Sequence, residues 1–197
     1  MERTKLPGTE EESAEVEKLD RSIRRREKGV KRYQFFLLRM LLLLLTVWLL
    51  FFVFIGVTHM PNGDMYPRVD AGDFVVYYRL DKSPKFQDVV VYQMADSSGK
   101  SSLLISRVIA VPGDTVELTE SGTLKVNGNA IAEPGIFYPN TLFRGQTAPS
   151  YPLTLGEDEY FVLGDKRDDA SDSRSFGPVP GKNLLGTVIT ILRRTKL

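Results

Sequence analysis

One long apolar run dominates the hydrophobic pattern of this chain. Residues Met40–Val57 carry no charged side chain over 18 positions, and Phe35–Leu38 extend the run toward the N-terminus. The hydrocarbon core of a bilayer is about 30 Å thick and needs roughly 20 helical residues to cross it. A helix in the core of a soluble protein is seldom apolar on all sides over such a length. The pattern therefore predicts a transmembrane helix over residues 35–57.

The sequence around this run favours an uncleaved signal anchor over a cleaved signal peptide. The run begins late in the chain, is long, and leads into Val57-Thr58-His59-Met60 without an Ala-x-Ala-like cleavage site. Basic residues gather before it, whereas the first lysine or arginine after it is Arg68. By the positive-inside rule, residues 1–34 form a cytoplasmic tail and residues 58–197 an extracytoplasmic domain. The basic residues before the run are Arg21, Arg24, Arg25, Arg26, Lys28, Lys31, Arg32 and Arg39.

The cytoplasmic tail has two parts of different composition. Residues 1–20 are polar and acidic and contain Pro7-Gly8, which predicts disorder. Residues 20–39 could form a basic helix lying on anionic lipid headgroups. The simpler interpretation is that their charges only set the topology.

Beyond the run, short segments rich in Val, Ile, Tyr and Phe alternate with turn residues, as is typical of a β protein. The pair Asn127-Gly128 between Thr123–Val126 and Asn129–Ile131 predicts a tight hairpin. Because Pro and Gly are frequent in residues 133–156, we expect a small irregular subdomain over about residues 118–156. The other predicted strands are Phe74–Tyr78, Val89–Tyr92, Leu103–Val111, Tyr160–Leu163 and Thr187–Leu192.

The composition excludes several kinds of chemistry. The chain is 42% hydrophobic, which is typical of a globular protein. It has 26 basic and 25 acidic residues, so it lacks the basic excess of a nucleic-acid-binding domain. It has no cysteine, which excludes disulfides, thiolate catalysis and Cys-type zinc sites. His59 is its single histidine, which argues against His-rich metal sites and a Ser-His-Asp triad. We therefore expect neither a metal nor a cofactor.

Three motifs follow one another in the outer domain. They are Met60-Pro-Asn-Gly-Asp-Met-Tyr-Pro67, Ser106-Arg-Val-Ile-Ala-Val-Pro-Gly-Asp114, and Gly164-Asp-Lys-Arg-Asp-Asp-Ala-Ser-Asp-Ser-Arg-Ser-Phe-Gly-Pro178. Together they resemble the sequence boxes of type I signal peptidases of the Gram-positive type, over nearly all of residues 60–192 and the anchor.

This resemblance implies a fold and a chemistry. The fold would be an antiparallel β-sheet domain with a small subdomain behind one N-terminal transmembrane helix. Active members are membrane-anchored serine proteases that remove signal peptides with a Ser nucleophile and a Lys general base. An exposed lysine with a pKa of about 10.4 cannot accept a proton at neutral pH, so that base must be shielded from water. By the same resemblance the scaffold residues of the motifs are Arg107, Gly113, Asp114, Gly164, Asp165, Arg167, Asp172 and Arg174.

The family positions that carry this chemistry hold other residues here. Asp64 precedes Met-x-Pro, where the family has its nucleophile, and Ser106 precedes Arg-Val-Ile, where it has its lysine. Ala170 falls on the place of the serine that positions the lysine, and Asn62 on the place of an oxyanion-hole hydroxyl of some relatives. A carboxylate with a pKa of about 4 is a weak base for a serine hydroxyl, and its charge opposes a developing oxyanion. We therefore expect no catalytic residues in this chain.

The function that we predict is a catalytically inactive, signal-peptidase-like accessory factor or chaperone in pilin polymerisation. It rests on a resemblance to pilus-associated signal-peptidase-like proteins, which lack the Ser/Lys dyad and can carry Asp at the nucleophile position. The implied partners are pilin subunits and a sortase, at a single-pass site in the cell membrane. The alternatives are an active type I signal peptidase with atypical residues, a regulator of a true signal peptidase, and a structural remnant.

A peptidase groove can bind without chemistry, because an extended partner segment gains affinity from main-chain hydrogen bonds to a sheet edge. Asp64 would then be either a tolerated replacement or a group that pairs with the partner. The predicted groove residues are Asn62, Asp64, Met65, Tyr66, Pro67, Val76, Ile105 and Ser106.

Overall fold

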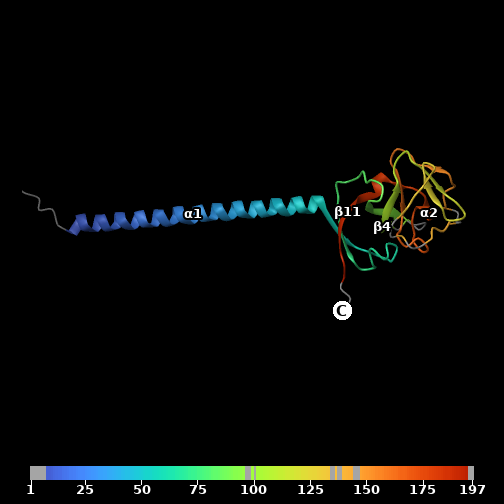
Figure 1. The fold of residues 1–197 in the computed structure, drawn as a ribbon. Coiled ribbons are helices and arrows are strands. Elements are labelled where there is room, and N and C mark those ends of the chain that lie inside the picture. The colour runs from blue at the N-terminus through green and yellow to red at the C-terminus, as the bar shows by residue number, and fades with distance from the viewer. Residues whose placement is uncertain are drawn as a thin grey trace, which may run out of the picture. The chain divides into compact units, whose positions relative to one another are not determined.

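The computed structural model describes residues 8–95, 99, 101–133, 136, 139–143 and 147–194. The chain divides into two compact units, Met1–Phe51 and Phe52–Leu197. The first consists of most of one long helix, α1 (Gly8–Phe54), and the second contains the described strands (Figure 1).

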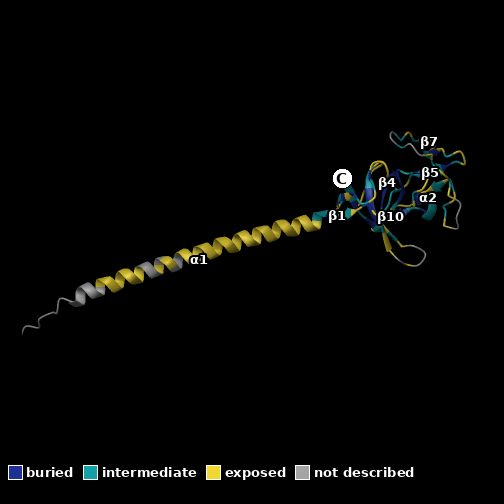
Figure 2. Ribbon diagram, turned by 90° about the horizontal axis from the view of Figure 1, so that it is seen from below, coloured by how far each residue is buried: buried dark blue, intermediate teal, exposed yellow. Residues whose placement is uncertain are grey.

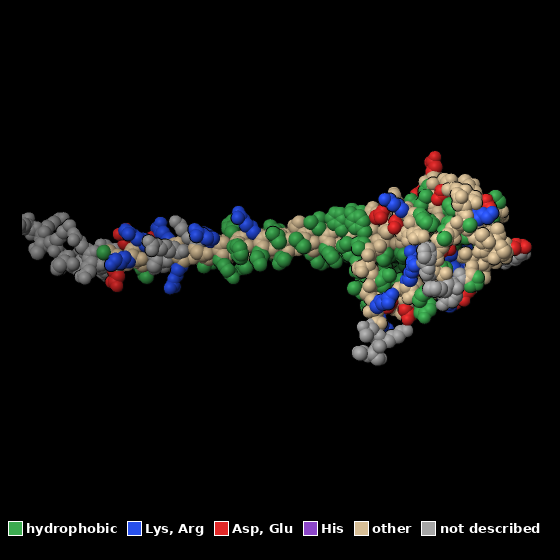
Figure 3. Space-filling model, in the orientation of Figure 1, with side chains coloured by type: hydrophobic (Ala, Val, Ile, Leu, Met, Phe, Trp, Pro, Cys, Tyr) green, Lys and Arg blue, Asp and Glu red, His purple; other side chains and the backbone are tan. Residues whose placement is uncertain are grey.

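Helix α1 contains residues 35–54 of the predicted membrane span. Its segment Gly29–Phe54 has 26 residues and is apolar enough to cross a bilayer, and at 1.5 Å per residue it is about 39 Å long. Basic side chains gather on the helix before the apolar run (Figure 3), and the described side chains of the helix are exposed as far as Val53 (Figure 2). This segment is therefore a candidate membrane anchor.

Both ends of α1 differ from the expectation. The helix begins at Gly8, within the stretch that we expected to be disordered, because the acidic and basic residues there are good helix formers and pair one turn apart. Arg24 pairs with Asp20 at 2.8 Å in this way. Residues 1–7 lie outside the described part of the chain. At its other end the helix stops at Phe54, three residues before the predicted end of the span, because Ile55–His59 form a strand.

A seven-stranded sheet forms the body of the second unit within the described residues. Its strand order is β1-β2-β11-β3-β4-β9-β10, and every pair is antiparallel. The predicted β class is therefore confirmed. The strands are β1 (Ile55–His59), β2 (Phe74–Tyr78), β3 (Val89–Ala95), β4 (Ser101–Ala110), β9 (Glu159–Leu163), β10 (Val179–Pro180) and β11 (Leu184–Leu192).

The expected subdomain contains a second, four-stranded sheet in the order β7-β6-β5-β8. The predicted hairpin is present, since Val126 pairs with Asn129 around a turn in which Asn127 and Gly128 have φ of 52° and 77°. Two successive positive φ angles are typical of a type I′ turn, which explains the Asn-Gly sequence. The strands are β5 (Thr115–Leu118), β6 (Leu124–Val126), β7 (Asn129–Ala130) and β8 (Leu153–Thr154).

Both faces of the large sheet are buried. Side chains alternate across β3, so Val91 packs in one core cluster with Ile105, whereas Val90 and Tyr92 pack in another with Val108. This double burial explains why the sequence of β3 begins as a continuous apolar run rather than with polar alternation. A short helix, α2 (Ser173–Phe176), and a 3-10 turn, η1 (Gly181–Asn183), complete the described elements.

Candidate functional site

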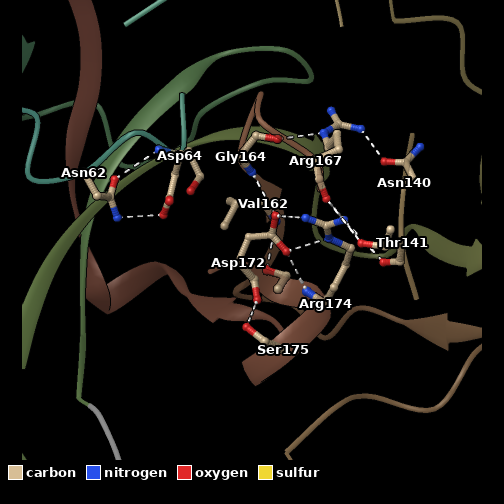
Figure 4. A network of polar contacts seen from close by, with 12 residues as sticks. Asn62, Asp64, Asn140, Thr141, Val162, Gly164, Arg167, Asp172, Arg174 and Ser175 are labelled. Carbon is tan, nitrogen blue, oxygen red and sulfur yellow. Dashed lines mark hydrogen bonds and ion pairs between the residues drawn. The ribbon is translucent and has the colours of Figure 1, made fainter. Parts of the chain in front are cut away.

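The nucleophile position lies in the loop between β1 and β2, where Asp64 is held by Asn62. The Asn62 side-chain amide donates to an Asp64 carboxylate oxygen at 2.8 Å, and the Asp64 backbone N–H donates back to Asn62 Oδ1 at 3.3 Å (Figure 4). Burial raises the pKa of Asp64, although hydrogen bonds from Asn62 and from the backbone of Ser171 oppose this shift. The carboxylate is thus half-buried and already accepts hydrogen bonds from its own chain.

The third motif packs directly against this loop. The Lys166 backbone N–H donates to the Asp64 carbonyl at 2.8 Å. A Cβ on Gly164 would lie 2.7 Å from the Asp64 carbonyl oxygen and 2.3 Å from the Ala170 Cβ, so only glycine fits at this contact. Ala170, at the place of the positioning serine, therefore does lie beside the segment that carries Asp64.

The general-base position lies on β4, where Ser106 contacts Tyr92 of β3. The Tyr92 and Ser106 hydroxyl oxygens are 3.0 Å apart, and both side chains are buried. Burial also raises the pKa of Tyr92, and the charges of Asp172 and Asp64 raise it further, so this phenol stays neutral at physiological pH. No signal in the sequence marked Tyr92, since a tyrosine is an ordinary strand residue.

These contacts leave each polar group of the site paired with something other than a catalytic partner. Asp64 accepts hydrogen bonds from Asn62, Ser106 pairs with Tyr92, and the Lys166 amine pairs with Asp169 at 2.9 Å. Within the described ranges no group of three His, Cys, Asp or Glu side chains could hold a metal ion. At the two dyad positions the arrangement offers hydrogen-bonding groups, a carboxylate at Asp64 and a hydroxyl at Ser106, in place of the family's hydroxyl and amine.

The first scaffold pair joins the second motif to the third. Arg107 donates from Nε and Nη2 to the two carboxylate oxygens of Asp165 at 2.8 and 2.7 Å, and from Nη1 to the Gln87 carbonyl. Asp165 is fully buried. Two parallel charge-assisted hydrogen bonds fix the geometry of such a pair. The pair therefore fixes the position of the loop after β9 relative to β4.

A second buried pair, Asp172 with Arg174, shapes the third motif. Asp172 accepts from the Arg174 guanidinium at 2.8 and 2.9 Å, from the Arg174 backbone N–H, and from the Gly164 N–H at 3.0 Å (Figure 4). It thereby caps α2 and satisfies backbone donors at both ends of the loop. Both side chains are buried, so this charged pair lies inside the protein and not in a loop exposed to solvent.

Arg167 connects the third motif to the subdomain loop. Its side chain is fully buried and contacts Glu133, the Gly164 carbonyl at 2.7 Å and the Asn140 side chain at 2.7 Å. Glu133 and Asn140 lie in the Pro/Gly-rich stretch and could not be singled out from the sequence. A buried arginine needs such partners, because an unpaired buried charge is strongly destabilising.

The remaining scaffold residues, Gly113 and Asp114, form the turn between the two sheets. Gly113 has a φ of 86°, and Asp114 accepts from the Val111 N–H at 2.9 Å and from the Asn127 side chain at 2.8 Å. This turn therefore connects β4 to the Asn-Gly hairpin of the subdomain.

The structure divides the predicted groove residues into two groups. Tyr66 and Pro67 are exposed and Val76 is half-buried, so these can face a partner. Met65 and Ile105 lie inside a core cluster and are not wall residues. Ile105 points into the protein by the alternation of β4, whereas Met65 is buried from the loop between β1 and β2. An open pocket of about 310 Å³ adjoins the exposed group, lined by Tyr66, Pro67, Asp70, Asp73, Arg193 and Arg194.

Known proteins similar to this chain include signal peptidases. A family model described as "Signal peptidase, peptidase S26" matches residues 33–192. A probable signal peptidase I-2 from Synechocystis is 31% identical over 135 residues, which cover 65% of this chain and 58% of the relative. A signal peptidase I from Pseudomonas aeruginosa is 28% identical and is covered over 62% of its length.

The matched part of the chain is thus shorter than the curated relatives, of whose length it covers less than two thirds. A crystal structure of a signal peptidase I from Enterococcus faecalis is 31% identical, with a TM-score of 0.43 over 56% of this chain and 99% of that chain. The family match extends over most of the sequence and includes all three motifs. The chain belongs to the signal peptidase family, peptidase S26.

Proposed function

We propose that this chain is a catalytically inactive member of the signal peptidase family that binds extended segments of pilin subunits at the outer face of the membrane and assists their polymerisation. The observation that carries the proposal is the pairing at the two dyad positions. Asp64 is held by Asn62 and Ser106 by Tyr92, so neither position supplies a nucleophile next to a base.

The electrostatics of the site also support binding without cleavage. In this family's chemistry a negative charge develops on the substrate carbonyl oxygen, and donors must stabilise it. The Asp64 carboxylate would place a second negative charge at that point. Burial raises the pKa of this carboxyl group, and the hydrogen bonds from Asn62 and the Ser171 backbone favour its charged form. The site therefore disfavours the transition state that the active relatives need.

The scaffold around the site, in contrast, is fully built. Buried ion pairs fix the third motif at Arg107–Asp165, Asp172–Arg174 and Arg167–Glu133. Burying these charges costs free energy of desolvation. A chain without any function would have no need to keep such buried pairs. The preserved architecture supports a role that requires a shaped groove, such as docking of an extended segment beside Tyr66 and Pro67.

The partner assignment rests on the resemblance of positions 64 and 106 to the pilus-associated signal-peptidase-like proteins. A membrane-tethered partner reaches a membrane-anchored groove at high effective concentration. The anchor in α1 would supply this proximity, with residues 58–197 on the outer side. An active signal peptidase is the second candidate function, since the relatives of similar sequence are described as signal peptidases.

Deletion of the gene separates the two candidates. A strain without it should still remove pilin signal peptides, while high-mass pilin polymers disappear from the wall fraction. Complementation with the full-length chain should restore the polymers. Accumulation of uncleaved pilin precursors in the deletion strain would instead support the peptidase.

Crosslinking tests whether the groove itself binds the pilin. A photoreactive phenylalanine analogue at Tyr66, whose side chain is 45% exposed, should capture the pilin subunit in intact cells. The matched control is the same analogue at Leu80, which is 53% exposed and follows β2 outside the three motifs. Equal capture of pilin at both positions, or no capture at Tyr66, would contradict docking in the groove.

A further inference from the structure

We propose that the Tyr92 side chain blocks the general-base position of this site. Restoring the family residues at positions 64, 106 and 170 alone therefore does not create a working base. This inference rests on the proposed non-catalytic function. It adds a fourth residue, from outside the three motifs, to the changes that separate this chain from an active enzyme.

The strand register places Tyr92 and Ser106 next to each other. Val90 pairs with Ser106 and Tyr92 pairs with Leu104, so Tyr92 and Ser106 are diagonal neighbours on one face of the sheet. Their oxygens lie 3.0 Å apart, and the side chains are 0% and 1% exposed. The phenol oxygen therefore occupies the space directly beyond the short serine side chain.

The side chains around Tyr92 are packed closely on this face of the sheet. The same face holds Val108 and Val162 in one core cluster, and the Phe176 ring lies 6.5 Å from the Tyr92 ring. Protein interiors are packed closely, so added methylene groups force their neighbours to move. A lysine at this position would have to displace the phenol or end against its oxygen.

Contact with the phenol oxygen would also spoil the lysine as a base. That oxygen would accept a hydrogen bond from the ammonium, and a hydrogen bond to the charged form favours that form. A family-type base requires the neutral amine at physiological pH. Tyr92 also lies near enough to Asp64 for the carboxylate to influence its pKa, so the phenol belongs to the same polar region as the nucleophile position.

The test compares two full-length variants in detergent micelles that differ only at Tyr92. The first carries Asp64→Ser, Ser106→Lys and Ala170→Ser, and the second carries these changes with Tyr92→Phe. Phenylalanine removes the oxygen that faces position 106 and keeps the ring. The pKa of the introduced amine is followed by NMR of ¹³C-methylated lysines, with its signal identified by its absence from a variant that retains Ser106.

We expect the pKa of the introduced amine to be higher by about 1 or more while Tyr92 is present than after Tyr92→Phe is added, because the phenol oxygen opposes the lowering by burial. Cleavage of an Ala-x-Ala peptide should be at least about tenfold faster in the second variant, in line with the larger fraction of neutral amine. The amine pKa decides the outcome even where neither variant cleaves. An equal amine pKa in both variants would overturn the inference.

A matched control is Tyr151→Phe in place of Tyr92→Phe. Tyr151 is a tyrosine whose buried hydroxyl has no hydrogen-bond partner within the described residues, so its removal should leave the amine pKa unchanged. An equal fall with Tyr151→Phe would also overturn the role of Tyr92. Cleavage by the wild-type chain would refute the proposed function, whereas an inert wild type with equal amine pKa values would refute only this inference.

Discussion

The Asn62 side-chain amide donates a 2.8 Å hydrogen bond to the carboxylate of Asp64, two residues later in the same loop. The Asp64 N–H donates in turn to Asn62, so the two residues form a closed local unit at the family's nucleophile position. The unit places a carboxyl group at this position, and that group already accepts a hydrogen bond from Asn62. Attack on a carbonyl requires a free hydroxyl instead.

The pH dependence of stability tests the environment of Asp64. Burial raises its pKa from the ordinary 3.8, so the folded chain binds this proton more tightly than the unfolded chain. Ionisation therefore costs stability between pH 3.8 and the raised folded pKa. The free energy of unfolding of the wild type, relative to Asp64→Asn, should fall as the pH rises through this window and then level off. Urea unfolding of both proteins from pH 3.5 to about 7 measures it, and a relative stability that increases over this range would contradict the burial.

Substitution of Gly164 tests the contact between the third motif and the Asp64 loop. Gly164→Ala should cost about 1–3 kcal/mol, because the added Cβ overlaps the Asp64 carbonyl and Ala170. Gly63→Ala is the matched control, since a Cβ there meets nothing within 4 Å. Thermal unfolding of the two variants should separate them clearly, and equal midpoints would show that the two loops do not pack in this way.

The buried pair of Arg167 with Glu133 should matter far more than an exposed pair. Arg167→Met leaves the largely buried Glu133 carboxylate unpaired and should cost about 3–5 kcal/mol. Lys125→Met removes the exposed pair with Glu117, whose charged atoms are 3.7 Å apart, and should cost less than about 1 kcal/mol. Denaturant midpoints provide the comparison, and similar losses in both variants would argue against the link between subdomain and third motif.

The charge asymmetry around the apolar run of α1 predicts the membrane topology of the chain. In protoplasts, added protease should degrade residues 58–197 of the full-length chain and spare a tag at the N-terminus. The reason for this expectation is the positive-inside rule, which places the end with the basic residues in the cytoplasm. Protection of the C-terminal part would overturn the orientation.

Much of the fold could be predicted because its strands have a local signal. Phe74–Tyr78 and the Asn127-Gly128 hairpin were predicted from β-branched and aromatic runs and from turn chemistry. Strand β1 was missed because Ile55–His59 continues the apolar run without a break, and only pairing with β2 distinguishes it from the span. The short strands β8 and β10 have two residues each, which is too few for a periodic pattern.

The site could be predicted only in part, for a similar reason. Asp64, Ser106 and Ala170 stand in motifs and were found through the resemblance of these motifs to the signal peptidase sequence boxes. Tyr92 and Glu133 act through contacts across strands or between distant loops, which leave no mark in the local sequence. Ile105 was predicted as a groove residue together with Ser106, but adjacent residues of a strand point to opposite faces, and Ile105 lies in a core cluster.

The measurement that tests the central claim most directly is cleavage of a pilin precursor by the purified full-length chain in detergent micelles, followed by mass spectrometry. The wild type and Asp64→Ala should both leave the precursor intact, because position 64 supplies no nucleophile and position 106 no base. An active signal peptidase in a parallel reaction should convert the same precursor. Cleavage by the wild type that is abolished by Asp64→Ala would contradict the account.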